Sequence, residues 1–231
     1  MSLYLALLLA SFSMPFLLSF DRKVAFHRLW RYLFPAIVMT ALFFIPADIL
    51  FTRHGVWGFN PRYHMHPPLA GLPPEEWLFF LVIPYASIFI HYVFISYCRS
   101  CLFSDRVTRM LTLFLIFALV ITAIAFMDRI YTVLYSLLAV ILLVAAVTSG
   151  EKLLNYFYLS FLIILIPFFI VNGVLTGTFI EEEVVWYNSA EITGLRLITV
   201  PVEDVIYGFC MILLTLLIMN WLRKRFPEMK S

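Results

Sequence analysis

The segment PPEEWLFF at residues 73–80 returns in altered form as PVEDVIYG at residues 201–208, and these two copies decide how the chain is organised. Each copy follows an aromatic–Asn pair, with the Asn thirteen residues before the first proline. One displacement of 128 residues relates all the matching positions (203 − 75 = 128). This constancy indicates an internal duplication, because acidic residues are scarce in the chain. The matching positions are Phe59, Asn60, Pro73, Glu75, Glu76 and Phe79 in the first copy, and Tyr187, Asn188, Pro201, Glu203, Asp204 and Tyr207 in the second.

The composition is that of an integral membrane protein. Of 231 residues, 63% are hydrophobic and only 13% are charged. Apolar stretches long enough to cross about 30 Å of hydrocarbon predict seven transmembrane helices, near residues 2–20, 33–51, 73–97, 109–127, 130–148, 153–176 and 199–221. Only a short polar break at 127–129 separates the fourth helix from the fifth. The sequence therefore predicts an all-α polytopic protein.

The duplication also predicts how the helices are grouped. It relates helices two and three to helices six and seven, which come four spans later. Because four is an even number, matching helices cross the membrane in the same direction. We expect two parallel three-helix repeats, residues 1–107 and 129–231, joined by a linking helix within residues 108–128. Parallel repeats pair about an axis along the membrane normal. The two acid pairs should then face each other and form one composite site.

The distribution of Lys and Arg predicts the orientation. We expect the N-terminus outside and the C-terminus in the cytoplasm, in the cell's inner membrane, with the first apolar run an uncleaved span. The net charge of +2 then reflects topology and does not suggest a nucleic acid partner. The inner side would hold Arg22, Lys23, Arg28, Arg31, Arg99, Arg106, Arg109, Lys152, Arg223, Lys224, Arg225 and Lys230, and the outer side Arg53, Arg62, Arg129 and Arg196.

The acid pairs are expected in the first turns of their helices. Pro73 and Pro201 suit that position, where a missing N–H is harmless. Phe79 and Tyr207 follow on the same helical face as the first acid of each pair. The helix dipole favours ionised carboxylates there, whereas burial and a neighbouring acid favour a retained proton. Isolated acids at such positions are often solvated caps, but the duplicated spacing argues for a functional pair.

These residues resemble the integral-membrane lycopene cyclases of the heterodimeric type, in the form where two small subunits are fused in one chain. The resemblance spans nearly the whole sequence and departs at Gly208, where the first copy has Phe80. It implies carotenoid biosynthesis: a carotenoid taken from the lipid membrane has its linear ends closed into rings, typically giving β-carotene. Contacts with other carotenoid enzymes stay open. The residues that carry the resemblance are Pro73, Glu75, Glu76, Phe79, Phe80, Trp186, Tyr187, Asn188, Thr193, Gly194, Arg196, Pro201, Glu203, Asp204 and Tyr207.

Ring closure needs an acid, a base and a dry pocket. A carboxyl group kept neutral can donate a proton and an ionised partner can accept one. We expect Glu75 or Glu203 to donate, with Glu76 or Asp204 as partner and acceptor. Aromatic faces can stabilise the intermediate cation, and polar groups inside membrane spans are commonly functional. The candidate substrate-binding residues are Asp48, Trp57, Asn60, Phe79, Phe80, Asn172, Trp186, Tyr187, Asn188, Arg196 and Tyr207.

Three of these candidates have a second interpretation. Asn60 and Asn188 would fix the geometry of their loops or hydrogen-bond a carboxyl group. Arg196 would pair with Glu203 or Asp204, or contact a lipid phosphate.

No recognised cofactor or metal site is evident. The chain lacks nucleotide-binding and diphosphate-binding motifs, although a requirement for a reduced flavin or nicotinamide stays open. The histidines of residues 54–66 lack further ligands at a zinc-like spacing, so no metal is predicted. Cys98 and Cys101, with Cys210 the only other cysteine, are too few for a disulfide or metal framework, and we interpret them as structural.

Two alternatives to the cyclase remain. A carotenoid hydratase would protonate the same double bond and let water capture the cation, so the acids do not separate it from a cyclase. A non-enzymatic seven-helix transporter or photoreceptor is the other. Against the photoreceptor stands the lack of a lysine within the seventh span, and against a carrier the position of the acids near one boundary, away from the midplane.

Overall fold

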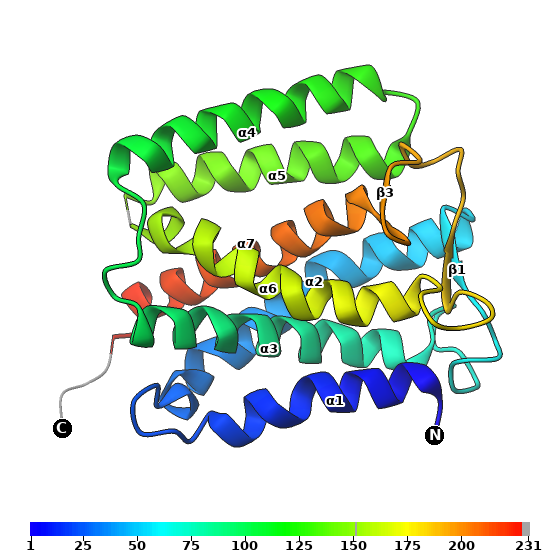
Figure 1. The fold of residues 1–231 in the computed structure, drawn as a ribbon, viewed down its shortest axis with the longest axis horizontal. Coiled ribbons are helices and arrows are strands. Elements are labelled where there is room, and N and C mark those ends of the chain that lie inside the picture. Colours follow the sequence, from blue (N-terminus) through cyan, green and yellow to red (C-terminus); the bar gives the residue numbers. More distant parts are fainter. Residues whose placement is uncertain (151, 228–231) are drawn as a thin grey trace.

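Seven helices run side by side between the same two ends of the molecule (Figure 1). The computed structural model describes residues 1–150 and 152–227, so Lys230, one of the cations used to predict orientation, lies outside the described residues. Six helices are long and apolar enough to cross a membrane, and α1 is shorter. The predicted all-α polytopic class is confirmed. The helices are α1 (Leu3–Leu18), α2 (Trp30–Arg53), α3 (Pro74–Tyr97), α4 (Asp105–Ala125), α5 (Ile130–Thr148), α6 (Leu153–Leu175) and α7 (Val202–Arg225), with a short 3-10 turn η1 (Phe26–Leu29) before α2.

Helix bounds differ from the prediction mainly where polar residues extend a helix. Helix α4 begins at Asp105, not near 109, because the Ser104 hydroxyl caps it by accepting a hydrogen bond from Val107 N at 3.4 Å. Helix α7 continues to Arg225, and basic residues in a last turn interact favourably with the helix dipole. The break predicted at 127–129 is confirmed, since α4 ends at Ala125 and α5 begins at Ile130.

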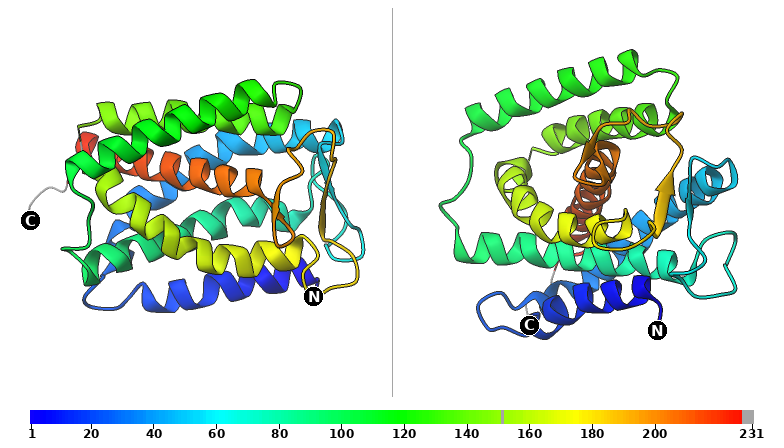
Figure 2. Two further views of the ribbon diagram at one scale, coloured as in Figure 1. Left: turned by 45° about the horizontal axis from the view of Figure 1, so that its top comes forward. Right: turned by 45° about the vertical axis from the view of Figure 1, so that its right-hand side comes forward.

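The halves of the chain interlock. Within each half, the first helix packs on the third, α1 on α3 and α5 on α7. Between the halves, α2 packs on α7 and α6 packs on α3. Helix α4 packs mainly on α5 and lies at the edge of the bundle (Figure 2). Helices α3 and α7, which carry the acidic motifs, therefore lie between elements of both halves.

A small strand pair, which the sequence analysis did not predict, ties the two halves together at one end of the bundle. Strand β1 (Trp57–Phe59) pairs antiparallel with β2 (Val185–Tyr187), and Gly58 lies opposite Trp186 at the centre. Because 58 + 128 = 186, the pairing is symmetric with respect to the duplication. Backbone hydrogen bonds from Asn60 N to Val184 O (2.8 Å) and from Asn188 N to Val56 O (2.9 Å) continue this symmetry. A second pair, β3 (Arg196–Leu197) with β4 (Val200–Pro201), precedes α7.

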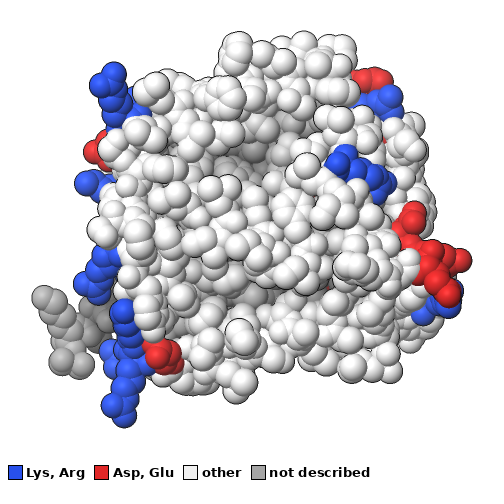
Figure 3. All heavy atoms as spheres, in the orientation of Figure 1, with Lys and Arg blue, Asp and Glu red and all other residues white. Residues whose placement is uncertain are grey.

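On the face shown in Figure 3, Lys, Arg, Asp and Glu gather towards the two ends of the molecule, and other residues form the surface between them. Lys and Arg prevail at the end where α4 begins, and acidic side chains are prominent at the end that carries β1 and β2. This separation suits a protein that spans a membrane. Which end faces the cytoplasm stays a prediction.

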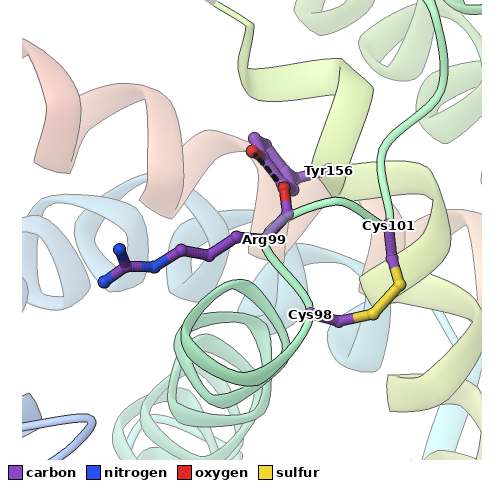
Figure 4. The surroundings of a disulfide bond; sticks show 4 residues. All are labelled: Cys98, Arg99, Cys101 and Tyr156. Atoms are coloured by element: carbon purple, nitrogen blue, oxygen red, sulfur yellow. Dashed lines mark hydrogen bonds between the residues drawn. A yellow bond between two sulfur atoms is a disulfide. The ribbon is translucent and has the colours of Figure 1, made fainter.

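A disulfide joins Cys98 and Cys101 just after α3, a bond that the sequence analysis did not predict (Figure 4). The same turn is held to α6 by the Tyr156 hydroxyl, which donates to the Arg99 carbonyl at 3.0 Å. Cys210 is buried and is the free cysteine.

We predict that Gly58→Ala destabilises the junction between the halves. A Cβ on Gly58 would lie 2.9 Å from Trp186 Nε1 and closer still to two carbons of the indole. Overpacking of this kind costs about 1–3 kcal/mol. The measurement is thermal unfolding of the detergent-purified protein, followed by a thiol-reactive dye that reaches the buried Cys210 only on unfolding.

The control is Gly58→Ala combined with Trp186→Leu, which removes the overlapping ring and should recover most of the lost melting temperature. A melting temperature of Gly58→Ala equal to that of the unaltered protein would contradict the close packing.

Candidate functional site

Two helix starts bring four carboxyl groups inside the protein. Pro73 and Pro201 occupy the N-cap positions of α3 and α7, and each acid pair follows in the first turn. Because proline has no N–H, neither cap leaves a donor unbonded. The acids are not solvated caps, since their exposed fractions are 0% for Glu75, 7% for Glu76, 0% for Glu203 and 6% for Asp204.

The first acid of each pair anchors the loop that precedes its helix. Glu75 Oε1 accepts hydrogen bonds from Met65 N at 2.8 Å and from the Ser2 hydroxyl. Glu203 Oε1 accepts from Thr193 N at 2.6 Å and from the Thr132 hydroxyl at 2.7 Å. The two loop amides are again 128 residues apart. The Oε2 atom of each acid is buried and has no hydrogen-bond partner among the described residues.

The second acid of each pair binds tyrosines instead. Tyr4 of α1 donates its phenol proton to Glu76 Oε2 at 2.6 Å. Tyr131 of α5, the corresponding helix of the second half, donates to Asp204 Oδ1 at 2.8 Å. Asp204 accepts a further bond from Tyr187 of β2, at Oδ2 and 2.8 Å. Thus the carboxyl group of Asp204 receives two phenol donors and that of Glu76 receives one.

A third carboxyl group joins these two. Asp48 of α2 is 2% exposed, and its Oδ1 accepts a hydrogen bond from the Tyr207 hydroxyl at 3.1 Å. The residue 128 positions later is Thr176, which instead binds the Asn172 carbonyl and the Thr199 hydroxyl. Asp48 is therefore a feature of the first half alone.

One cavity of about 420 Å³ connects the three carboxyl groups. Glu76, Asp204 and Asp48 line it together with their tyrosine partners, whereas Glu75 and Glu203 lie outside its lining. The remaining walls are largely apolar and come from α1, α3, α6, α7, β1 and β2. Residues of both halves thus enclose a single site, as the duplication suggested.

Eight of the candidates chosen from the sequence line this cavity, and the others do not. The lining candidates are Asp48, Trp57, Glu76, Phe79, Asn172, Tyr187, Asp204 and Tyr207. Among the rest, Phe80 is buried at 1% exposure and Trp186 lies over Gly58, 40% exposed. Whether these residues bind substrate stays a prediction.

The polar candidates outside the cavity shape the loops. The side chains of Asn60 and Asn188 accept bonds from the backbone N–H two residues later, both at 3.0 Å, which is the Asx turn. Asn60 also donates to Glu182 Oε2 at 2.8 Å. Arg196 Nη1 donates to the Thr199 carbonyl at 2.7 Å and forms no ion pair with either acid of α7.

Tyr4 and Tyr131, which hydrogen-bond the cavity acids, were not predicted from the sequence. Both lie in apolar helices, where a tyrosine is ordinarily a packing or interfacial residue. A signal was present, because the two are 127 residues apart, one short of the displacement of the acidic motifs. Helices α1 and α5 are therefore offset by one residue in the repeat, which hid the correspondence.

Tyr187 is held in its protonated form. Burial raises the pKa of this phenol well above its ordinary value, and the nearby Asp204 carboxylate acts in the same direction. The hydroxyl therefore remains a proton-bearing hydrogen-bond donor across the physiological range.

Comparison with known proteins identifies the family. A family model described as lycopene cyclase matches residues 1–94 and 128–222, which together are most of the chain. The starts of these stretches differ by 127 residues and their ends by 128 (128 − 1 and 222 − 94), close to the displacement of the acidic motifs. No curated protein and no solved structure matches the chain. The chain belongs to the lycopene cyclase family and is an enzyme of carotenoid cyclisation.

Proposed function

We propose that the protein is a lycopene β-cyclase that works by acid–base chemistry in the cavity between its halves. The observation that carries this proposal is the group of three buried carboxyl groups, each bound to a tyrosine, at the end of an otherwise apolar cavity. Family membership supplies the substrate class.

The reaction moves protons and leaves the electron count of the substrate unchanged. A carboxylic acid protonates the terminal double bond of the linear end and leaves a tertiary cation. The neighbouring double bond attacks this cation, which forms the ring bond and moves the positive charge into the ring. A carboxylate then removes a proton from the ring carbon that leaves the new double bond in the β position. The product is an isomer of the substrate, so no oxidant or reductant is consumed.

We assign the two proton transfers to the acids that line the cavity. Asp204 accepts two phenol hydrogen bonds, which stabilise a carboxylate, and so suits the base. Glu76 accepts one and suits the proton donor. The rings of Trp57, Phe79 and Tyr207 border the same space and can stabilise the cation.

This assignment differs from the sequence-based one in the role of Glu75 and Glu203. Both bind loop backbone and a neighbouring hydroxyl, and neither lines the cavity. We assign them the positioning of the loops and of the adjacent cavity acids. Asp48 is a third polar group beside the reacting end, held by Tyr207.

The cellular setting follows from the charges. We propose a multi-pass location in the inner membrane with the C-terminus in the cytoplasm, because twelve of the sixteen Lys and Arg lie on that side of the predicted topology. The carotenoid would then reach the enzyme from within the bilayer. No cofactor is expected to be consumed.

We predict that Glu76→Gln and Asp204→Asn each lower the rate of cyclisation roughly a hundred- to ten-thousandfold, because each removes a group that transfers a proton. In contrast, Glu75→Gln and Glu203→Gln should keep most of the activity, since an amide oxygen still accepts the same hydrogen bonds. The assay is pigment chromatography in a lycopene-accumulating bacterium, confirmed as rates on the purified protein in vesicles.

Glu183→Gln, in an exposed loop, is the matched control for loss of a carboxylate. Inactive Glu75→Gln or Glu203→Gln beside active Glu76→Gln and Asp204→Asn would reverse the roles proposed here. Unchanged lycopene in cells with the unaltered protein would overturn the cyclase itself.

We further predict that the reaction in D₂O places one deuterium in each ring, because the proton that is added and the proton that is removed occupy different carbons. Mass spectrometry of the product made in ordinary water separates a cyclase from a hydratase. A cyclised product has the mass of lycopene, whereas a hydrated product is heavier by a water molecule. A product free of deuterium would contradict protonation by an exchangeable carboxylic acid.

A further inference from the structure

We propose that the cavity continues as an apolar groove between α1, α3 and α6, opens sideways to the bilayer, and holds the unreacted part of the carotenoid. This inference rests on the proposed function, because it takes the reacting end to lie at Glu76 and Asp204. It adds the route of access and the binding surface for the rest of the molecule.

The cavity is elongated along the helices. On α1 its lining runs from Tyr4 to Leu18, and on α3 from Glu76 to Ile90. Each stretch covers fourteen residue steps, or about 21 Å at 1.5 Å per residue. The carboxyl groups lie at one end of this length only. A linear molecule with one end at the acids would therefore lie parallel to the helices.

Beyond the acids the groove is lined mainly by apolar side chains, which suit a hydrocarbon. On α1 it is lined by Ala10, Met14, Pro15 and Leu18, and on the facing part of α6 by Pro167 and Phe168. The hydroxyl of Ser11 is satisfied within its own helix, where it donates to the Leu7 carbonyl at 2.8 Å. Ser87 of α3 also lines this part of the cavity, and the other side chains named here offer an apolar surface to a polyene.

The groove is open on the side where α1 approaches α6. Helix α1 packs mainly on α3 and only slightly on α6. Met14 is 68% exposed and Leu18 is 48% exposed, although both line the cavity. The middle of the same face carries no Lys, Arg, Asp or Glu (Figure 3). The opening thus faces the hydrocarbon of the bilayer, where a carotenoid dissolves.

A departure from the repeat shapes the part of the cavity wall where α7 meets α6. Phe80 is buried in the first half and does not line the cavity, whereas its counterpart Gly208 does. A Cβ on Gly208 would lie 3.3 Å from Phe168 Cε2, so even a methyl group would press on the α6 wall. Glycine at this position therefore allows Phe168 of α6 to lie close against α7, whereas a phenylalanine such as Phe80 of the first half would collide with that ring.

The test compares two pairs of tryptophan substitutions. Met14→Trp and Ala86→Trp add bulk to the groove, whereas Leu17→Trp and Leu81→Trp add it to neighbouring exposed positions, 71% and 44% exposed, that do not line the cavity. Ala86 lies ten residues, about 15 Å along the helix, from Glu76. We expect the groove variants to raise KM for lycopene in vesicles roughly tenfold, the size of effect that a misfit in an apolar pocket produces. Their kcat should change less, and both control variants should keep the KM and kcat of the unaltered protein.

Met14→Trp keeps the test informative if Ala86→Trp misfolds, because Met14 is mostly exposed and its replacement disturbs no core. A photo-crosslinking residue at position 14 should also attach to lycopene in vesicles, and one at position 17 should not. If the unaltered protein cyclises lycopene but Met14→Trp keeps its KM and position 14 yields no adduct, the groove is wrong and the cyclase stands. If the unaltered protein does not cyclise lycopene, the proposed function fails first.

Discussion

The structure depends on burying carboxyl groups at the start of two apolar helices. An ionisable group out of water costs several kcal/mol unless hydrogen bonds compensate it. At each helix start here the donors come from outside the helix: a loop amide and a hydroxyl for the first acid, and a tyrosine for the second. These bonds require α1 to lie against α3 and α5 against α7. The hydrogen bonds of the acids therefore fix which helices pack against α3 and α7.

The duplication explains why two such sites meet in one cavity. The two residues at the centre of the β1–β2 pair are themselves 128 positions apart, so the pairing has the symmetry of the duplication. It brings the starts of α3 and α7 to the same end of the bundle. Symmetry alone would give two equal acids in equal surroundings. Asp48 has no counterpart, since Thr176 stands in its place, and Asp204 has an additional tyrosine. In the proposed mechanism, these differences separate the carboxyl group that donates a proton from the one that accepts it.

The sequence predicted the features that depend on composition and on the repeat. The seven helices, the break between α4 and α5, and the convergence of the acid motifs on one site all followed from hydropathy and a constant displacement. Other features depend on packing. Hydropathy does not tell which face of α1 meets α3, so Tyr4 was missed as the partner of Glu76. Strands of three residues are too short to leave a pattern, so the pairing of β1 with β2 was not foreseen.

Why each motif contains two adjacent acids follows from helix geometry. Successive residues of an α-helix point about 100° apart, since 3.6 residues complete a turn, and adjacent side chains do not share a face. One acid can therefore face the cavity only if its neighbour faces elsewhere, here the loop and the neighbouring helix. The neighbour fixes the loop before its helix, and in the second half this loop follows directly after Tyr187 of β2, which binds Asp204. Each acid pair thus places one carboxyl group in the cavity and one in the support of the loop within a single helical turn. In the proposed mechanism, the duplication supplies the second proton-transfer group that ring closure requires.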